Sequence, residues 1–396
     1  MKSQFRGFLF EAKHLTGLLV AAATVAVFLY MEVGAVAQSK STLSALPSTP
    51  QAPKDNPTTP AKAALGRLLF WDPLLSGPQD VACASCHHPQ NGYAEDRDLS
   101  LGVTAIGLGS KRRQAPGSSI PIVKRNSPTV VNIAFSGSDE SGRYDPATAP
   151  MFWDLRVKSL EKQALEPLKA HEEMRGTTYK EDEAVASVVA KLQANAEYRS
   201  LFAGAFGGAQ PVNAENLGRA IAAFERTLLA NNSPFDRYMR GDRSAMTEEQ
   251  VSGMQRFERV GCIKCHNGPM FSDYKLHVMG VPDNPALPAS DDGAEKTYAF
   301  RTASLRNLAF TAPYEHNGMF RTLSDVVGFY EDARGGRSRN PNVSSEKLDP
   351  LLRELGDFDE EDVDLVEFLR ALSDDSFDRT IPERVPSGLP VGGKIQ

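Results

Sequence analysis

The feature that most constrains this chain is the pattern Cys-x-x-Cys-His, which occurs twice. Cys83 and Cys86 precede His87 in "CASCH", and the second copy is "CIKCH" at residues 262–266. The 396-residue chain has four cysteines, so these two sites use all of them. Any account of the fold must therefore explain what the two sites bind.

The N-terminus is typical of an export signal. Lys2, Arg6 and Lys13 precede an apolar run over residues 15–31, and "AVAQ" offers a small-x-small cleavage site after Ala37. We expect a signal peptide over residues 1–37 and a periplasmic location. The apolar run is slightly shorter than the roughly 20 residues that span a bilayer, so the protein meets a membrane only if the signal is retained as an anchor.

Length and composition set the expected domain organisation. Residues 38–60 are rich in Ser, Thr and Pro, which favours a flexible linker. The remaining length suits two domains of ~150 residues each, predicted at 61–240 and 241–375, followed by a loose Pro/Gly-rich tail at 376–396. A net charge of −6 argues against a nucleic-acid partner.

Apolar periodicity predicts a mainly α fold. Several segments place apolar residues at helical spacing, and no convincing run of alternating strand residues is present, although short hairpins in the Gly/Pro-rich loops stay open. The helical segments are "NAENLGRAIAAFERTLLAN" with Leu217, Ile221, Phe224 and Leu228, "TEEQVSGMQRFERV" with a capping box at Thr247 and Gln250, and "EEDVDLVEFLRALS" with Val363, Val366 and Leu369 on one stripe.

Cys-x-x-Cys-His is the attachment signature of c-type haem, whose vinyl groups form thioethers with both thiols while the histidine binds iron. The competing interpretations are a thioredoxin-like redox pair, which needs a βαβ context, and a four-cysteine zinc site, which leaves both histidines unexplained. We therefore expect two covalent haems, with His87 and His266 as iron ligands. Only His88 competes nearby for the first iron, and its place beside His87 keeps it off the opposite face, so that haem is expected to be five-coordinate.

Five segments together resemble the bacterial dihaem cytochrome c peroxidases and their relative MauG. They are "LGRLLFWDPLLSGPQDVACASCHHP", "RNSPTVVNIAF", "MFWDLRVKSLEKQALEPLKAHEEM", "GCIKCHNGPMFSD" and "FRTASLRNLAFTAPYEHNG", and the likeness covers roughly residues 61–372. It implies two c-type cytochrome domains packed around two haems. In such a protein the N-terminal haem reduces hydrogen peroxide with electrons passed through the C-terminal haem.

The resemblance also implies roles around the first haem. Trp153 matches a tryptophan that relays electrons between haems, although a core aromatic is the plain alternative. Gln163, Pro167 and Glu173 match the distal pocket, where Glu173 is the expected acid and base. A carboxylate there can move a proton between the peroxide oxygens. Glu172 is nearly as good a candidate from the sequence, and His171 lies close enough to contribute.

At the second haem the resemblance offers a choice of ligand. The family closes this haem with Met in the peroxidases and with Tyr in MauG, and the matching residue here is Tyr330. Met319 and Met279 are the rival ligands, while His277 is expected either to contact a ligand residue or to pack in the core. Tyr ligation stabilises ferric iron, whereas Met raises the potential. Tyr330 therefore favours MauG-like chemistry, in which electrons come from a protein or other bulky donor.

A calcium ion between the domains is another family feature, and oxygen ligands suit such a hard cation. Asn126, Thr311 and Pro313 match its ligands. The electron donor is expected to be a small cytochrome, a cupredoxin or a protein substrate. A conventional cytochrome c peroxidase is the alternative within the same class. A passive dihaem electron-transfer protein, with both irons six-coordinate, is the alternative outside it.

Overall fold

The structure is a computed structural model that describes residues 43–358 and 363–396. The predicted signal peptide at 1–37 lies outside the described residues. Within them, no helix has the length and apolar character needed to cross a membrane.

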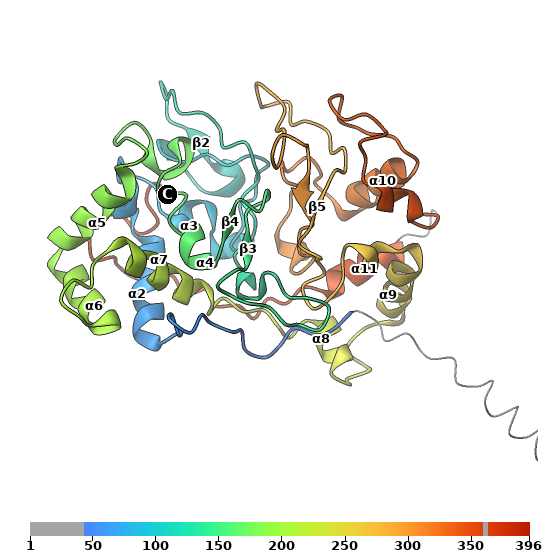
Figure 1. Cartoon of the computed structure of the whole chain (residues 1–396), viewed down its shortest axis with the longest axis horizontal. Helices are drawn as coiled ribbons and strands as arrows, with labels where there is room; N and C mark the ends of the chain where they lie inside the picture. Colours follow the sequence, from blue (N-terminus) through green and yellow to red (C-terminus); the bar gives the residue numbers. More distant parts are fainter. Residues whose placement is uncertain (1–42, 359–362) are drawn as a thin grey trace, which may run out of the picture. The chain divides into compact units, whose positions relative to one another are not determined.

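The described chain is mainly helical, as predicted, and its strands are limited to three short antiparallel pairs (Figure 1). The helices are α2 (Pro60–Trp71), α3 (Cys83–Cys86), α4 (Leu160–Gln163), α5 (Ala184–Ala194), α6 (Ala196–Phe206), α7 (Ala214–Glu225), α8 (Pro234–Met239), α9 (Glu248–Val260), α10 (Leu323–Arg334) and α11 (Val363–Ala371). The strands pair as β1 (Ala105–Ile106) with β2 (Arg113–Gln114), β3 (Pro150–Met151) with β4 (Val157–Lys158), and β5 (Leu276–His277) with β6 (Phe300–Arg301).

Local sequence explains how α9 delivers the second Cys-x-x-Cys-His site. The predicted capping box is confirmed, because the Thr247 side chain accepts from the Gln250 N–H and the Gln250 side chain accepts from the Thr247 N–H. The helix ends at Gly261, whose φ of 96° lies in the left-handed region that glycine tolerates. Cys262 follows directly, so the helix end fixes where the motif begins.

Two helix pairs cross in the same way. A β-carbon on Gly66 of α2 would lie 2.0 Å from the Ala220 carbonyl oxygen in α7. A β-carbon on Gly253 of α9 would lie 1.9 Å from the Asp364 carbonyl oxygen in α11. In both pairs only glycine permits this approach of two helix backbones.

One helical turn beyond each glycine, an aromatic pair repeats the same geometry. Phe70 and Phe224 meet edge to face with ring centroids 5.3 Å apart, and Phe257 and Phe368 do so at 5.4 Å. Such pairs stabilise a core by about 0.5–1.5 kcal/mol beyond the area they bury. The chain therefore contains one helix-pair arrangement twice.

The loops that return to these helix pairs are duplicated as well. Asn132 and Asn307 both have φ of 64°. Their N–H groups donate to Leu228 and Leu372 at 2.9 and 3.3 Å. Their side-chain oxygens accept from the backbone N–H groups of Ala230 and Asp374 at 2.8 and 3.0 Å. The weak internal repeat visible in the sequence thus extends to backbone conformation and hydrogen bonding.

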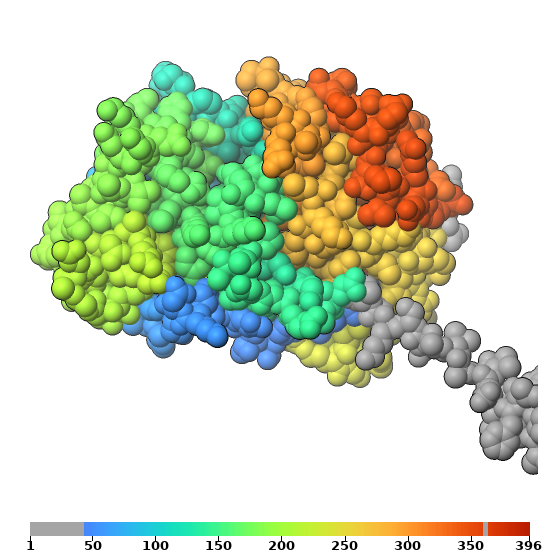
Figure 2. Space-filling model, in the orientation of Figure 1, coloured from blue at the N-terminus to red at the C-terminus, as the bar shows by residue number. Residues whose placement is uncertain are grey.

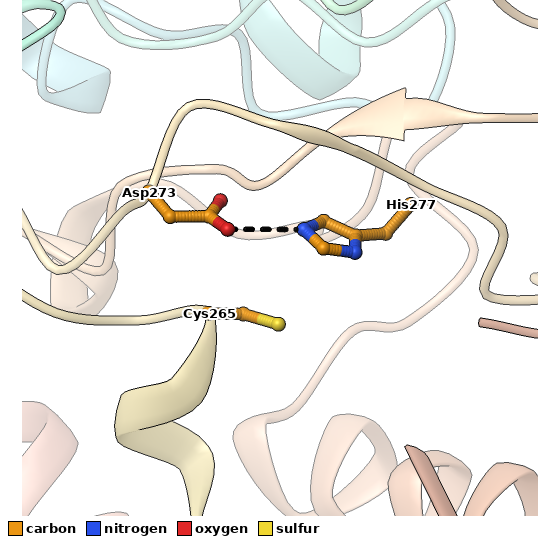
Figure 3. Close-up of side chains that lie close together, drawn as sticks. All are labelled: Cys265, Asp273 and His277. Carbon is orange, nitrogen blue, oxygen red and sulfur yellow. Dashed lines mark hydrogen bonds and ion pairs between the residues drawn. The ribbon is translucent and has the colours of Figure 1, made fainter. Parts of the chain in front are cut away.

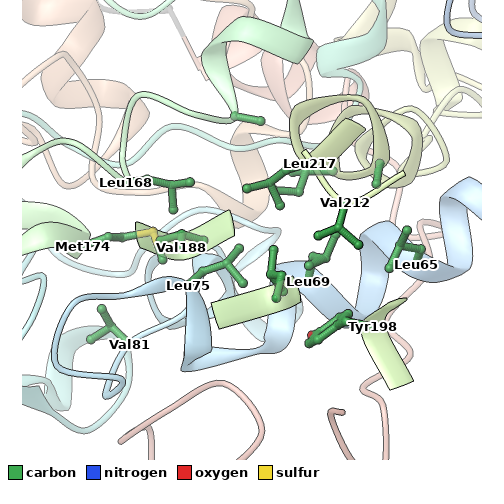
Figure 4. Close-up of a cluster of buried hydrophobic side chains, with 14 of the residues drawn as sticks. Leu65, Leu69, Leu75, Val81, Leu168, Met174, Val188, Tyr198, Val212 and Leu217 are labelled. Atoms are coloured by element: carbon green, nitrogen blue, oxygen red, sulfur yellow. The ribbon is translucent and has the colours of Figure 1, made fainter. Parts of the chain in front are cut away.

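The core follows this division. One cluster joins α2, α5, α6 and α7 (Figure 4), where Leu65, Leu69, Leu192 and Leu217 are all within 1 % of complete burial. A second cluster joins α9 and α11 around the buried Phe368. In Figure 1 the first group of helices lies to one side, and α9, α10 and α11 lie to the other. This arrangement places one Cys-x-x-Cys-His site beside each helix pair.

Three expectations need correction, and they concern the linker, the C-terminal tail and Val363. Residues 43–60 were expected to form part of a flexible linker, but Leu43 and Leu46 are buried and Asn56 is fully enclosed. These residues lie along the body, as the blue atoms of Figure 2 show. The tail after residue 375 was expected to be loose, yet Phe377 is buried in a core cluster. Val363 is exposed although its spacing placed it on the apolar stripe.

Candidate functional site

The first Cys-x-x-Cys-His site is built on the short helix α3. The backbone N–H of His87 donates to the Cys83 carbonyl at 2.9 Å, which places both residues on one turn. The imidazole Nδ1 of His87 lies 3.1 Å from the carbonyl oxygen of Tyr93. Its Nε2 faces the Ser127 hydroxyl at 3.4 Å. A proton on Nδ1 satisfies that carbonyl and leaves Nε2 available to bind iron.

The second site repeats these contacts. The His266 N–H donates to the Cys262 carbonyl at 2.9 Å, and Nδ1 of His266 lies 2.9 Å from the Phe271 carbonyl. Tyr93 and Phe271, which supply the two carbonyls, are fully buried and have φ of 55° and 53°. Both imidazoles are therefore oriented by the backbone in the way that iron-ligating histidines require.

The two thiols of the first motif have raised pKa values, unlike reactive thiolates. All four cysteines are free of disulfides. Burial raises the pKa of Cys86 to about 12 and raises that of Cys83 further. A thioredoxin-like pair or a zinc site needs a stabilised thiolate, whose pKa is lowered. The first motif thus lacks the stabilised thiolate of a thioredoxin-like redox pair.

One cluster among the described residues brings three potential metal-ligand atoms together: Cys265, Asp273 and His277 (Figure 3). Nδ1 of His277 lies 2.6 Å from Asp349 and Nε2 lies 3.2 Å from Asp273, so both ring nitrogens already have carboxylate partners. Asp273 first, then Cys265 and Asp349, raise the pKa of His277 to about 11. His277 is therefore a buried cation beside the second motif.

The first motif has a matching ion pair. Nη1 of Arg112 lies 3.2 Å from the Cys86 sulfur and 3.7 Å from Glu95, and burial raises the Glu95 pKa to about 7. Each second cysteine is thus flanked by a cation and a carboxylate. Arg112 was not predicted from the sequence as a partner of the motif, because it reaches the motif from a separate loop.

A cavity opens around the second motif. Its volume is about 240 Å³, against roughly 10–15 Å³ for one water. Cys262, Cys265 and His266 line it, as do Tyr330 from α10 and Met279, whereas Met319 is not among its lining residues. Burial, then the nearby Glu315 carboxyl, raise the Tyr330 pKa well above its usual value. Of the proposed second-haem ligands, Tyr330 and Met279 therefore face the right cavity.

The cavity wall also carries an unpaired cation. Arg301 lines it and forms no ion pair among the described residues, and its Nε has no hydrogen-bond partner. Burial lowers its pKa. Arg301 is half-buried, and its Nη1 donates to the Pro150 carbonyl at 3.4 Å. A half-buried guanidinium with no carboxylate partner suits an anionic ligand. The propionate carboxylates of a haem would supply that charge, so the residues present fit this cofactor.

Trp153 lies on the same wall and reaches toward the first motif. Its indole N–H donates to the Asn126 carbonyl at 3.0 Å. The next residue is Ser127, whose hydroxyl contacts His87. On the other side Trp153 meets His316 edge to face at 6.5 Å. The indole thus lines the cavity around the second motif. Through Asn126 and Ser127 it is also connected to His87.

Glu173 lies in a single π-helical turn, residues 171–175. Its backbone carbonyl accepts from Val103 at 2.9 Å, which fixes the turn. Burial, then the charge of Glu172, raise the Glu173 pKa to about 7. Of the two adjacent carboxyls, Glu173 is the one whose charge raises the pKa of both Cys83 and Cys86. Its position therefore favours it over Glu172 as the group that serves the first site.

For the other residues predicted near the first motif, the structure gives their elements and burial. Gln163 ends α4 and Pro167 follows one turn later, and both are half-buried, as is His171. The loop after α4 packs through Ala164 and Leu168 on the cluster of Figure 4.

Asn126, Thr311 and Pro313, the residues that match calcium ligands in the resemblance, are all among the many residues that line this cavity. The Asn126 side-chain N–H donates to the Arg97 carbonyl at 2.9 Å, so its side-chain oxygen does not take part in that bond. This arrangement supplies oxygen donors, which a hard cation prefers.

Comparisons with known proteins agree with this geometry. Residues 60–244 match the family model described as di-haem cytochrome c peroxidase. The chain is 34% identical over 337 residues to a methylamine utilization protein MauG from Methylorubrum extorquens, covering 84% of this chain and 83% of that one. It is 33% identical over 300 residues to cytochrome c551 peroxidase of Pseudomonas aeruginosa, covering 73% and 77%. A crystal structure of a MauG-like protein associated with microbial copper homeostasis superposes with a TM-score of 0.66 at 27% identity, covering 84% and 95%.

Proposed function

The chain belongs to the dihaem cytochrome c peroxidase and MauG family and is a haem peroxidase, an oxidoreductase; we propose that it reduces hydrogen peroxide at the haem held by Cys83, Cys86 and His87. The second haem is held by Cys262, Cys265 and His266 and passes on the electrons. The observation that supports this proposal most strongly is the shared orientation of His87 and His266 beside half-buried thiol pairs. Membership of the family implies haem c, peroxide and an electron donor.

When bound, the first haem supplies the iron at which the peroxide bond is reduced. The chain's own part is to manage protons there. With a pKa of about 7, Glu173 is able to accept and return a proton near neutral pH. We assign it the transfer of a proton from one peroxide oxygen to the other, with Gln163 and Pro167 shaping the pocket. Overall, peroxide takes up a pair of electrons and a pair of protons and leaves as water.

Electrons reach the first haem through Trp153 in this proposal. Support comes from the position of its indole on the wall of the second cavity, with its N–H on the carbonyl beside Ser127. That N–H faces a backbone carbonyl, which is a poor base, so an oxidised indole would keep its proton. The indole would then pass electrons without a coupled proton transfer.

We further assign Tyr330 as the second ligand of the C-terminal haem, which makes the protein MauG-like. The position of Tyr330 in the cavity with His266 supports this assignment. Ligation by Met279, which lines the same cavity, would instead give a conventional cytochrome c peroxidase. The proposal includes a calcium ion on Asn126, Thr311 and Pro313, domains near 61–240 and 241–375, and export to the periplasm, where a protein donor supplies electrons.

Electron paramagnetic resonance of the ferric holoprotein, combined with a peroxide-consumption assay, tests this function. The proposal requires one high-spin haem with an open face, one low-spin haem, and turnover of peroxide with an added donor. Two low-spin haems and no consumption of peroxide would instead identify a passive electron carrier.

A further inference from the structure

A chain of polar side chains enters the core beside the first Cys-x-x-Cys-His site. Glu225 is the last residue of α7 and is 4% exposed, and Arg226 is 3% exposed. The Arg226 Nη2 donates to Glu161 Oε1 at 2.6 Å. The Glu161 side chain is 16% exposed. These side chains thus lead from Glu161, which solvent reaches, to Glu225, which is almost completely buried.

Three side-chain atoms of Glu161, Arg226 and Glu225 have no hydrogen-bond partner among the described residues. They are Oε2 of Glu161, Nη1 of Arg226 and Oε2 of Glu225, and all three are buried. Leaving such atoms unpaired costs about 1–3 kcal/mol each, and more where they are charged. Buried polar atoms in native proteins are usually satisfied by ordered water when the protein does not supply a partner. We therefore expect water to link the two carboxyls past the guanidinium.

The internal repeat places Glu225 at the first haem. Phe224 and Phe368 are equivalent, so the residue that follows each is equivalent too: Glu225 in α7 and Leu369 in α11. Leu369 lines the cavity of the second haem. The Glu225 carboxylate acts on the Cys83 thiol and raises its pKa, as a neighbour in the equivalent position should. The first site thus has an acid where the second has a leucine.

The protonation of Glu225 suits a role in proton transfer. Burial raises the pKa of Glu225, Arg226 opposes this rise and the charge of Glu161 adds to it. The result is a pKa of about 8. Glu225 therefore carries a proton at neutral pH. Arg226 stays charged and transfers none itself. Its ion pair keeps Glu161 in place at the outer end of the chain.

Reduction of peroxide consumes protons that Glu173 alone does not supply, because its transfer is between the two peroxide oxygens. We propose that Glu225, linked through water to Glu161, delivers protons from solvent to the first haem site. This inference rests on the proposed function. In each turnover peroxide takes a pair of electrons from the donor protein and a pair of protons from solvent, and its oxygen–oxygen bond breaks to leave water. Each delivered proton leaves Glu225, which recovers it through Glu161.

The test compares Glu225→Gln with Glu215→Gln in the holoprotein. Glu215 is an exposed carboxylate on the same helix. Glu225→Gln keeps the shape of the side chain but cannot exchange a proton. We expect it to lower the rate of peroxide consumption at saturating donor about tenfold or more. Wild type should lose rate above pH 8 as Glu225 ionises, and this decline should be absent in Glu225→Gln. Glu215→Gln should match wild type, and Glu225→Asp should recover part of the rate.

Infrared spectroscopy gives a second readout that needs no turnover. Wild type should show the carbonyl band of a protonated carboxylic acid that disappears with a midpoint near pH 8, and Glu225→Gln should lack it. If Glu225→Gln does not fold, the same band and the pH profile are measured in Glu225→Asp. The inference fails if these variants keep the wild-type rate, pH profile and infrared band while wild type consumes peroxide. Absence of peroxide consumption by wild type would overturn the proposed function instead.

Discussion

Gly253 of α9 lies so close to the Asp364 carbonyl of α11 that a β-carbon would stand 1.9 Å from that oxygen. Gly66 has the same relation to Ala220, at 2.0 Å. Each crossing sits beside a Cys-x-x-Cys-His site, so the approach of the two backbones helps to position the residues of that site.

Replacing Gly253 by Ala should therefore destabilise the holoprotein. The added methyl group forces the helices apart, and overpacking of this kind costs about 1–3 kcal/mol in the free energy of unfolding. Gly204 of α6 is the matched control, because a β-carbon there would meet nothing within 4 Å. Gly204→Ala should stabilise by up to about 1 kcal/mol through helix propensity. Thermal unfolding of both variants measures the difference, and a Gly253→Ala protein as stable as wild type would contradict the close crossing.

The sequence predicted those parts of the fold that depend on local patterns. The helix that begins after Thr247 and the helix that carries Phe224 follow from capping and from apolar spacing, and both are confirmed. The mainly α class is confirmed on the same grounds. A pattern of this kind reports on residues within a turn or two of each other, where the physical interactions are short in range.

Interactions between distant residues could not be predicted in this way. Leu43 and Leu46 sit in a Pro-rich stretch that is typical of linkers, yet the structure buries them. Arg301 looks like a surface residue in the sequence, and only the fold shows that it faces a cavity without a counter-charge. Glu225 was hidden in the same way, since an acid at the end of an amphipathic helix normally marks its solvent side.

Glu173→Gln should lower peroxide consumption by about 10²–10⁴-fold, the usual contribution of a positioned acid or base. Glu172→Gln, the neighbouring carboxyl, should change the rate little. Because Glu173 must be ionised to accept a proton and its pKa is about 7, the wild-type rate should rise with pH through 7. That rise should be absent in Glu173→Gln. Initial rates across the pH range measure this, and equal losses in both variants would show that the assignment to Glu173 is wrong.

Arg301→Gln should lower the midpoint potential of the second haem. Removing a buried cation from the cavity favours the ferric state, which carries the extra positive charge. A fall on the order of 59 mV would correspond to a tenfold change in the one-electron equilibrium. Arg301→Lys keeps the charge and should stay near the wild-type potential. Potentiometric titration followed by visible absorbance distinguishes the two, and an unchanged potential in Arg301→Gln would show that no haem carboxylate lies beside it.

Tyr330→Phe should remove the second ligand of the C-terminal haem. Burial keeps the free Tyr330 phenol protonated, so only bond formation to iron can ionise it at neutral pH. The variant should therefore lose the tyrosinate-to-iron absorption, and its second haem should become high-spin. Met279 lines the same cavity and serves as the control: Met279→Leu should leave both spectra unchanged. Should Met279→Leu alter the second haem while Tyr330→Phe does not, the ligand is methionine. The haem would then have the higher potential of a conventional cytochrome c peroxidase.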